Sequence, residues 1–102
     1  MTAEQLKNIL DKTQYPVAYR YFSTPQKSPY ICFYFSDNKD FFADGKSYAN
    51  FKKYRIELYT DGKDETAEKT VETALKDICF EKYEDYIDTV KKTRINYEIE
   101  EI

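Results

Sequence analysis

The strongest constraint on the fold is the segment 30–35, whose sequence YICFYF places aromatic or apolar side chains on both faces of an extended strand. Strands of this composition are covered on both sides in folded domains. Left bare, the same residues would have the composition of an aggregation-prone strand. We therefore expect an inner strand whose second face is covered by the first helix or by a neighbouring subunit.

The core has to be built largely from aromatic side chains. Eleven Tyr and seven Phe bring the aromatic fraction to 18% of 102 residues, whereas Leu, Ile, Val and Phe together number 22. These 22 residues are a share of the chain only just above roughly 20%, and chains with a smaller share of such hydrophobic residues are commonly disordered. A chain of this length has room for a single domain, which we expect to span residues 1–102.

Two segments have the apolar spacing of amphipathic helices. The first begins at a capping box formed by Thr2 and Gln5 and ends at about Lys12. The second spans residues 65–78 and follows Asp64, a favourable capping residue. Its predicted buried stripe consists of Ala67, Val71, Ala74, Leu75 and Ile78. The residues of this helix predicted to face water are Glu65, Glu68, Lys69, Glu72 and Lys76.

Alternating side chains predict strands at 17–22, 30–35, 51–60, 80–89 and 93–99. A further hairpin strand is expected within residues 41–48, where Asp44-Gly45 is a strong turn signal, and the polar residues 36–40 predict another turn. In the region 80–89 we expect Tyr83 and Ile87 to be buried. The predicted order is α-β-β-β-β-α-β-β, an α+β fold with a mixed or largely antiparallel sheet and two helices packed on it.

The residue types exclude several kinds of chemistry. The chain contains no His, which removes the commonest general base and every His-based metal site. Cys32 and Cys79 cannot complete a four-ligand zinc site alone. They could pair as a disulfide, but in a reducing cytosol we expect free, buried thiols. No pair of carboxylates is marked as an acid and a base. We therefore assign no catalytic, cofactor-binding or metal-ligating residue and expect a protein that is not an enzyme.

Charge and hydropathy indicate where the protein works. The N-terminal residues lack the basic and apolar segments of a signal peptide, and the apolar run at 30–35 is far too short to span a membrane. The expected location is therefore the cytoplasm, with no membrane partner. A net charge of −3 argues against a general nucleic-acid binder, because phosphate neutralisation supplies most of non-specific affinity.

The aromatic residues are the feature that points to a binding surface. Exposed aromatics on a sheet can stack unpaired bases, as in oligonucleotide-binding domains. Because cations are few near the predicted aromatic strands, we favour self-association or a permanent protein partner, for which Tyr and Phe are suited. The candidate interface residues are Tyr19, Tyr21, Tyr34, Phe41, Phe42, Asp44, Lys46, Tyr48 and Tyr59.

Several segments together resemble a known group of proteins. They are residues 15–22, Pro25, residues 29–32, residues 41–45, residues 54–60 and the pair Tyr97-Glu98. In these segments the chain resembles small tail-completion, or tail-terminator-like, proteins encoded by long-tailed phages and prophages of Gram-positive bacteria. The likeness covers roughly residues 3–100 and carries no catalytic motif.

The resemblance implies a structural role in the virion. Such proteins close the growing tail tube or join the tail to the head, commonly as rings of six subunits. The implied partners are further copies of this chain, assembled in advance or only on the tail, and tail-tube or head-connector subunits, with no sequence-specific nucleic acid. The implied location is the host cytoplasm and then the virion tail. The alternatives are a small phage-encoded adaptor or regulatory binding module and, after it, an oligonucleotide-binding domain.

Overall fold

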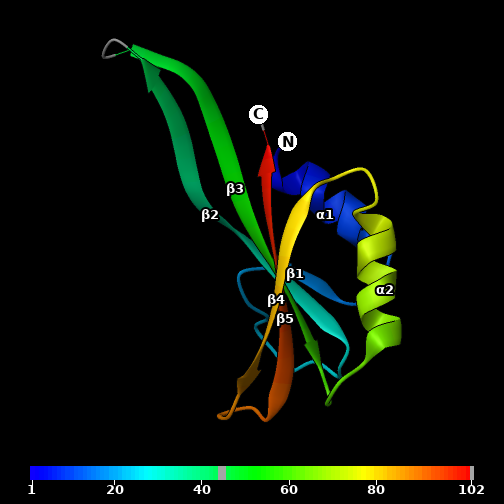
Figure 1. Ribbon diagram of the computed structural model, residues 1–102. Coiled ribbons are helices and arrows are strands. Elements are labelled where there is room, and N and C mark those ends of the chain that lie inside the picture. The colour runs from blue at the N-terminus through cyan, green and yellow to red at the C-terminus, as the bar shows by residue number, and fades with distance from the viewer. Residues whose placement is uncertain (44–45, 102) are drawn as a thin grey trace.

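The alternating segments assemble into one mixed sheet with both helices on one of its faces (Figure 1). The computed structural model describes residues 1–43 and 46–101, with side chains for residues 1–36 and 52–100. The described elements are α1 (Ala3–Asp11), β1 (Val17–Tyr19), β2 (Tyr30–Ala43), β3 (Lys46–Thr60), α2 (Glu65–Ala74), β4 (Phe80–Ile87) and β5 (Lys92–Glu101). The strand order is β1-β2-β3-β5-β4; β1 runs parallel to β2, and the other neighbouring pairs are antiparallel. The predicted α+β class, mixed sheet and two packed helices are confirmed.

Both helices begin at the predicted capping residues. The amide of Gln5 donates to Thr2 Oγ1 at 3.1 Å while the amide of Thr2 donates to Gln5 Oε1 at 2.8 Å, which completes the capping box. At the start of α2, Asp64 Oδ1 accepts from the amide of Ala67 at 3.0 Å. These contacts satisfy backbone donors that have no partner within a helix.

β2 and β3 form one long hairpin, which replaces three of the predicted strands. The turn expected at residues 36–40 is wrong, because β2 continues to Ala43 with register shifts between Phe35 and Asp37 and between Phe41 and Phe42. Bulges of this kind let a ladder continue through a local irregularity. The element order is therefore α-β-β-β-α-β-β. The predicted turn residues Asp44 and Gly45 lie outside the described residues.

Part of this hairpin projects away from the rest of the sheet (Figure 1). At the end of β5, Glu101 pairs with Lys52 of β3. Beyond that point, within the described ranges, residues 39–43 and 46–51 pair only with each other, and we call this segment the ribbon. The molecule is accordingly elongated, measuring 49 × 27 × 26 Å.

The core lies between the helices and one face of the sheet. Ile31, Leu58 and Ile95 are cross-strand neighbours in one row, and Phe33, Ile56 and Tyr97 form the next row. The side chains that α1 and α2 contribute to this core are Leu6, Leu10, Ala67, Val71 and Leu75. Alternation along each strand therefore assigns its apolar residues to the helices and its other residues to the opposite face.

Several local predictions need correction. β1 ends at Tyr19, before residues 20–22, because Arg20 adopts φ +70° in the left-handed region. α2 ends at Ala74, which is half-buried, and Leu75 is its C-cap. Tyr83, expected to be buried, is 40% exposed.

Within the described ranges, no helix is long and apolar enough to cross a membrane.

Glu68 was predicted to face water, but it is only 4% exposed. Lys63 and Lys82 each approach its carboxylate to 2.8 Å, from the loop before α2 and from β4. Burial alone would raise the pKa of Glu68, but the hydrogen bonds from these two lysines outweigh it and lower that pKa. A buried carboxylate is tolerated here because it is paired.

Replacing Ile56, which is fully buried at the centre of the core, tests this packing. Ile56→Ala should lower the free energy of unfolding by about 2–5 kcal/mol, because it leaves a cavity that the surrounding side chains cannot fill. Val90→Ala removes apolar atoms from a side chain that is 51% exposed and should change stability by no more than about 0.5 kcal/mol. Urea unfolding followed by circular dichroism measures both, and equal midpoints would contradict the central position of Ile56.

Candidate protein-interaction face

The sheet face opposite the helices carries an unusual combination of tyrosine and arginine. The register places Tyr30, Tyr59 and Arg94 in one cross-strand row and Tyr34 and Arg55 in another. All three arginines of the sequence lie here, since the guanidinium of Arg20 stacks over the Tyr34 ring at 5.2 Å. We call this surface the Tyr–Arg face and define it by Arg20, Tyr30, Tyr34, Arg55, Glu57, Tyr59, Tyr83, Asp85, Arg94 and Asn96.

Glu57 is the centre of the face and is only 6% exposed. The hydroxyl of Tyr59 donates to Glu57 Oε1 at 2.8 Å, and that of Tyr34 donates to Oε2 at 3.4 Å. Arg94 Nη1 lies 3.5 Å from Oε2 and supplies the opposite charge. Burial and the hydrogen bond to Glu57 raise the pKa of Tyr59, so this phenol is a stable donor. A carboxylate that would be costly to bury is thus paired from three directions.

Arg94 also forms a two-pronged contact with Asp85 of the neighbouring strand. Its Nε donates to Asp85 Oδ1 at 2.9 Å, and its Nη2 donates to Oδ2. Asn96, which is fully buried, donates to the same carboxylate through Nδ2 at 3.1 Å. The hydrogen bond from Arg94 is the main cause that lowers the pKa of Asp85. When a planar guanidinium donates to both oxygens of a carboxylate, the two side chains are held in one geometry.

Arg55 lies at the other end of this network of hydrogen bonds and ion pairs. It donates through Nη1 to the Tyr34 hydroxyl at 3.3 Å and lies 3.8 Å from Glu98. Its guanidinium also stacks over the ring of Tyr83 at 5.2 Å. Cation–π contacts of this kind stabilise by about 0.5–1 kcal/mol where they are exposed. The charges of this face therefore neutralise one another and leave flat aromatic and guanidinium groups at the surface.

An open cavity of about 580 Å³ adjoins the face, between the segment that follows β1 and the turn between β4 and β5. The stacked rings of Tyr30 and Tyr59, 5.0 Å apart, line it together with Cys32. Tyr21, which is 74% exposed, and Val90 are its most accessible apolar lining residues. The cavity has a size typical of ligand or side-chain pockets.

The second face of the 30–35 segment has a different cover from the one expected. α1 packs on the opposite face, so the first helix does not cover it. Phe22, in the segment after β1, stands edge-on to Tyr30 at 5.7 Å, and Arg20 stacks on Tyr34. The chain thus covers part of this face with its own loop.

The structure brings together three of the candidate interface residues and separates a fourth. Tyr21, Tyr34 and Tyr59 lie on or beside the Tyr–Arg face. Tyr19 lies on the helix side, edge-on to Phe33 at 5.2 Å, and its hydroxyl accepts from the amide of Phe35. The side chains of Phe41, Phe42, Lys46 and Tyr48, and the whole of Asp44, lie outside what the structure describes.

Sequence reasoning missed Arg55, Arg94, Tyr83 and Asp85. The signal was present, because Arg55 and Arg94 alternate with core residues on their strands and so must lie opposite the helices. What was missing was the pairing of β3 with β5 and of β5 with β4, which brings these side chains into contact. Strand pairing between distant segments is not visible in local alternation.

No protein-family model matches the chain. No curated protein matches it either. Within the described residues, no group of three or more Cys, Asp or Glu side chains is arranged to hold a metal ion. The Tyr–Arg face is therefore interpreted from its own contacts.

The two cysteines are free but differ in burial, and Cys79 is exposed, contrary to the expectation. Burial, and after it the charge of Glu57, raises the pKa of the Cys32 thiol to about 11. Iodoacetamide at pH 8 should therefore alkylate Cys79 rapidly and Cys32 at least about tenfold more slowly, because the thiolate is the reactive form. Mass spectrometry of peptides at timed intervals measures both rates. Equal rates in the folded protein would contradict the burial of Cys32.

The Asp85 contact predicts a loss of stability in acid. Its pKa is lowered in the folded state, so the stability it contributes is present above the unfolded value near 4 and is lost as pH falls through the folded value. Urea midpoints should therefore fall between about pH 5 and pH 3. Asp85→Asn should cost about 1 kcal/mol at pH 7 and flatten this dependence. Glu81→Gln, on the same strand, should leave the pH dependence unchanged; an equal effect of the two variants would contradict the assignment.

Proposed function

We propose that this chain is a non-enzymatic structural protein of a phage or prophage, which completes the tail or joins it to the head through protein–protein contacts made as a ring. The observation that carries the proposal is the Tyr–Arg face. It is an ordered surface of the residue types that dominate protein interfaces. The resemblance to tail-completion proteins supplies the kind of assembly.

The arrangement of the face supports a docking role. Its side chains are already held by stacking and by hydrogen bonds around Glu57, so that ordering them on association costs little conformational entropy. The cavity beside it offers an apolar recess next to Tyr21. Aromatic anchors beside ordered charge pairs are the arrangement found at the energetic centres of interfaces.

A ring requires two different contact patches on each subunit. The ribbon is a candidate for the second patch, since it projects from the sheet and its two strands pair only with each other in the described ranges (Figure 1). An isolated two-stranded ribbon is marginally stable in water, and its free edges can accept a strand from a neighbour. The proposed partners are therefore further copies of this chain and tail-tube or head-connector subunits, in the host cytoplasm and then in the tail.

Native mass and tail-tube length test this proposal. Light scattering from low micromolar to near millimolar concentration, with and without the polymerising tail-tube protein of the same phage or prophage genome, should show a closed ring or shortened, capped tubes. A monomer that leaves tube length unchanged would end the tail-completion proposal and favour the small adaptor, whose binding site would be the cavity.

A pair of tyrosine variants connects the result to the cavity beside the Tyr–Arg face. Tyr21→Ala, in the lining of this cavity, should weaken ring formation or capping by about tenfold, the scale of an interface anchor. Tyr19→Ala removes another exposed tyrosine, 43% accessible, on the helix side of the sheet and should change neither. Equal behaviour of the two variants would show that this side of the sheet is not the contact surface.

A further inference from the structure

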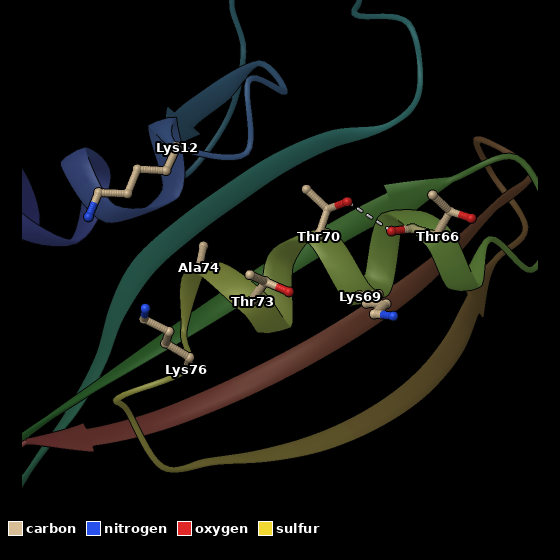
Figure 2. A pocket seen from close by; sticks show the side chains of 7 residues that line it. All are labelled: Lys12, Thr66, Lys69, Thr70, Thr73, Ala74 and Lys76. Atoms are coloured by element: carbon tan, nitrogen blue, oxygen red, sulfur yellow. Dashed lines mark hydrogen bonds between the residues drawn. The ribbon is translucent and has the colours of Figure 1, made fainter.

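An open groove of about 520 Å³ lies between the end of α1 and α2 (Figure 2). Its lining residues are Lys12, Thr66, Lys69, Thr70, Thr73, Ala74 and Lys76, and we call it the lysine groove. The lining contains neither a carboxylate nor an aromatic ring. The groove is therefore a positively charged surface edged with hydroxyl groups, on a protein whose net charge is −3.

The three lysines of this groove have no carboxylate partner in the described part of the chain. In the described part of the chain, acids pair with Lys7, Lys53, Lys63, Lys82 and Lys92, whereas the unpaired lysines outside the groove, Lys27, Lys52 and Lys91, lie on separate segments. Glu72 stands one turn from both Lys69 and Lys76, yet its carboxylate contacts Lys82 and the Tyr97 hydroxyl. The positive charge of the groove is thus left for a partner outside the subunit.

α2 separates its charges onto two sides. Glu68 and Glu72 face β4, where Lys82 contacts both of them. Lys69 and Lys76 lie on the side that faces the end of α1. Because the acidic side is neutralised internally and the basic side is not, the helix presents net positive charge toward the groove.

The shape of the groove favours an extended partner over a small anion. Lys12 is the C-cap of α1, Lys69 lies in the middle of α2 and Lys76 follows the C-cap of α2. Their ammonium groups do not converge on one point (Figure 2). Without an aromatic ring to stack bases, and with a net negative chain, a nucleic acid is disfavoured. An acidic protein surface fits these features.

The chain itself carries such a surface. β4 is an edge strand that contains Glu81, Glu84 and Asp85, and Asp88 follows it in the turn to β5. Glu81 and Asp88 are exposed and have no ion-pair partner in the described residues. Residues 81–87 of this extended strand span about 20 Å, which is long enough to reach along the lysine groove.

We propose that the lysine groove of one copy of this chain receives the acidic β4 edge of a second copy. The inference rests on the proposed ring-forming function and adds a further contact between neighbouring subunits. Groove and edge are different patches on one subunit, so the contact is head-to-tail and generates a ring when the rotation closes. As a contact between solvent-exposed charges it weakens as salt rises.

Matched charge reversals test this contact. K69E/K76E reverses two groove lysines, and K27E/K52E reverses two exposed lysines outside both the groove and the β4 edge, so that both variants change the net charge equally. Sedimentation of the full chain at low and high salt should show self-association of the wild type that weakens with salt. K69E/K76E should weaken it by about tenfold and K27E/K52E by less than about twofold.

The reciprocal variant identifies the other side of the contact. E81K/D88K should weaken self-association like K69E/K76E, and mixing the two variants should restore association of the pair. Circular dichroism should show unchanged folding, since all substituted side chains are exposed.

Three results would overturn the inference: no self-association at low salt, equal effects of the groove and control variants, or no restoration on mixing. Groove-dependent binding of a labelled oligonucleotide at physiological salt, without self-association, would assign the groove to nucleic acid. If wild type and K69E/K76E cap tail tubes equally, the proposed function stands and this contact fails. If wild type neither caps tubes nor forms a ring, the proposed function fails.

Discussion

The rest of the structure depends on the burial of β3 on both of its faces. Ile56 and Leu58 are fully buried under the helices, whereas Glu57, between them, is buried on the opposite face without a helix over it. A carboxylate in that position requires a positive partner and hydrogen-bond donors. Arg94 from β5, Tyr59 from β3 and Tyr34 from β2 supply them. The polar face is therefore as specific in its pairing as the apolar core.

The two faces together determine the strand register. Tyr59 stands opposite Arg94, and Glu57 opposite Asn96, while Leu58 pairs with Ile95. A slip of one residue would move Ile95 out of the core and the guanidinium of Arg94 into it. Both changes are unfavourable, so the core and the Tyr–Arg face specify the same alignment. Order on the outer face is thus part of the fold, because the contacts that hold its side chains are made within the subunit.

Features that arise from neighbours in the chain could be predicted from the sequence. The Thr2 and Asp64 caps, the alternation along β3 and β5 and the α+β class all depend on residues a few positions apart. The predictions were wrong where contacts between distant segments determine the structure. Glu68 is buried because Lys63 and Lys82 reach it, and β2 continues through the polar residues 36–40 because β3 pairs with it. Of the candidate site, the tyrosines were identifiable by type, but their arginine partners required the strand order.

This small protein covers several of its less apolar surfaces in the same way, with long charged side chains. Long charged residues lie across their neighbours and are neutralised in place, as Arg55 and Arg94 are on the outer face and Lys63 and Lys82 are beside α2. Their apolar stems exclude water while their charged ends are paired. Between α1 and α2 this arrangement is absent, since three unpaired lysines share one groove with no acidic residue in its lining. A complementary acidic surface from outside the subunit would neutralise them in the same way.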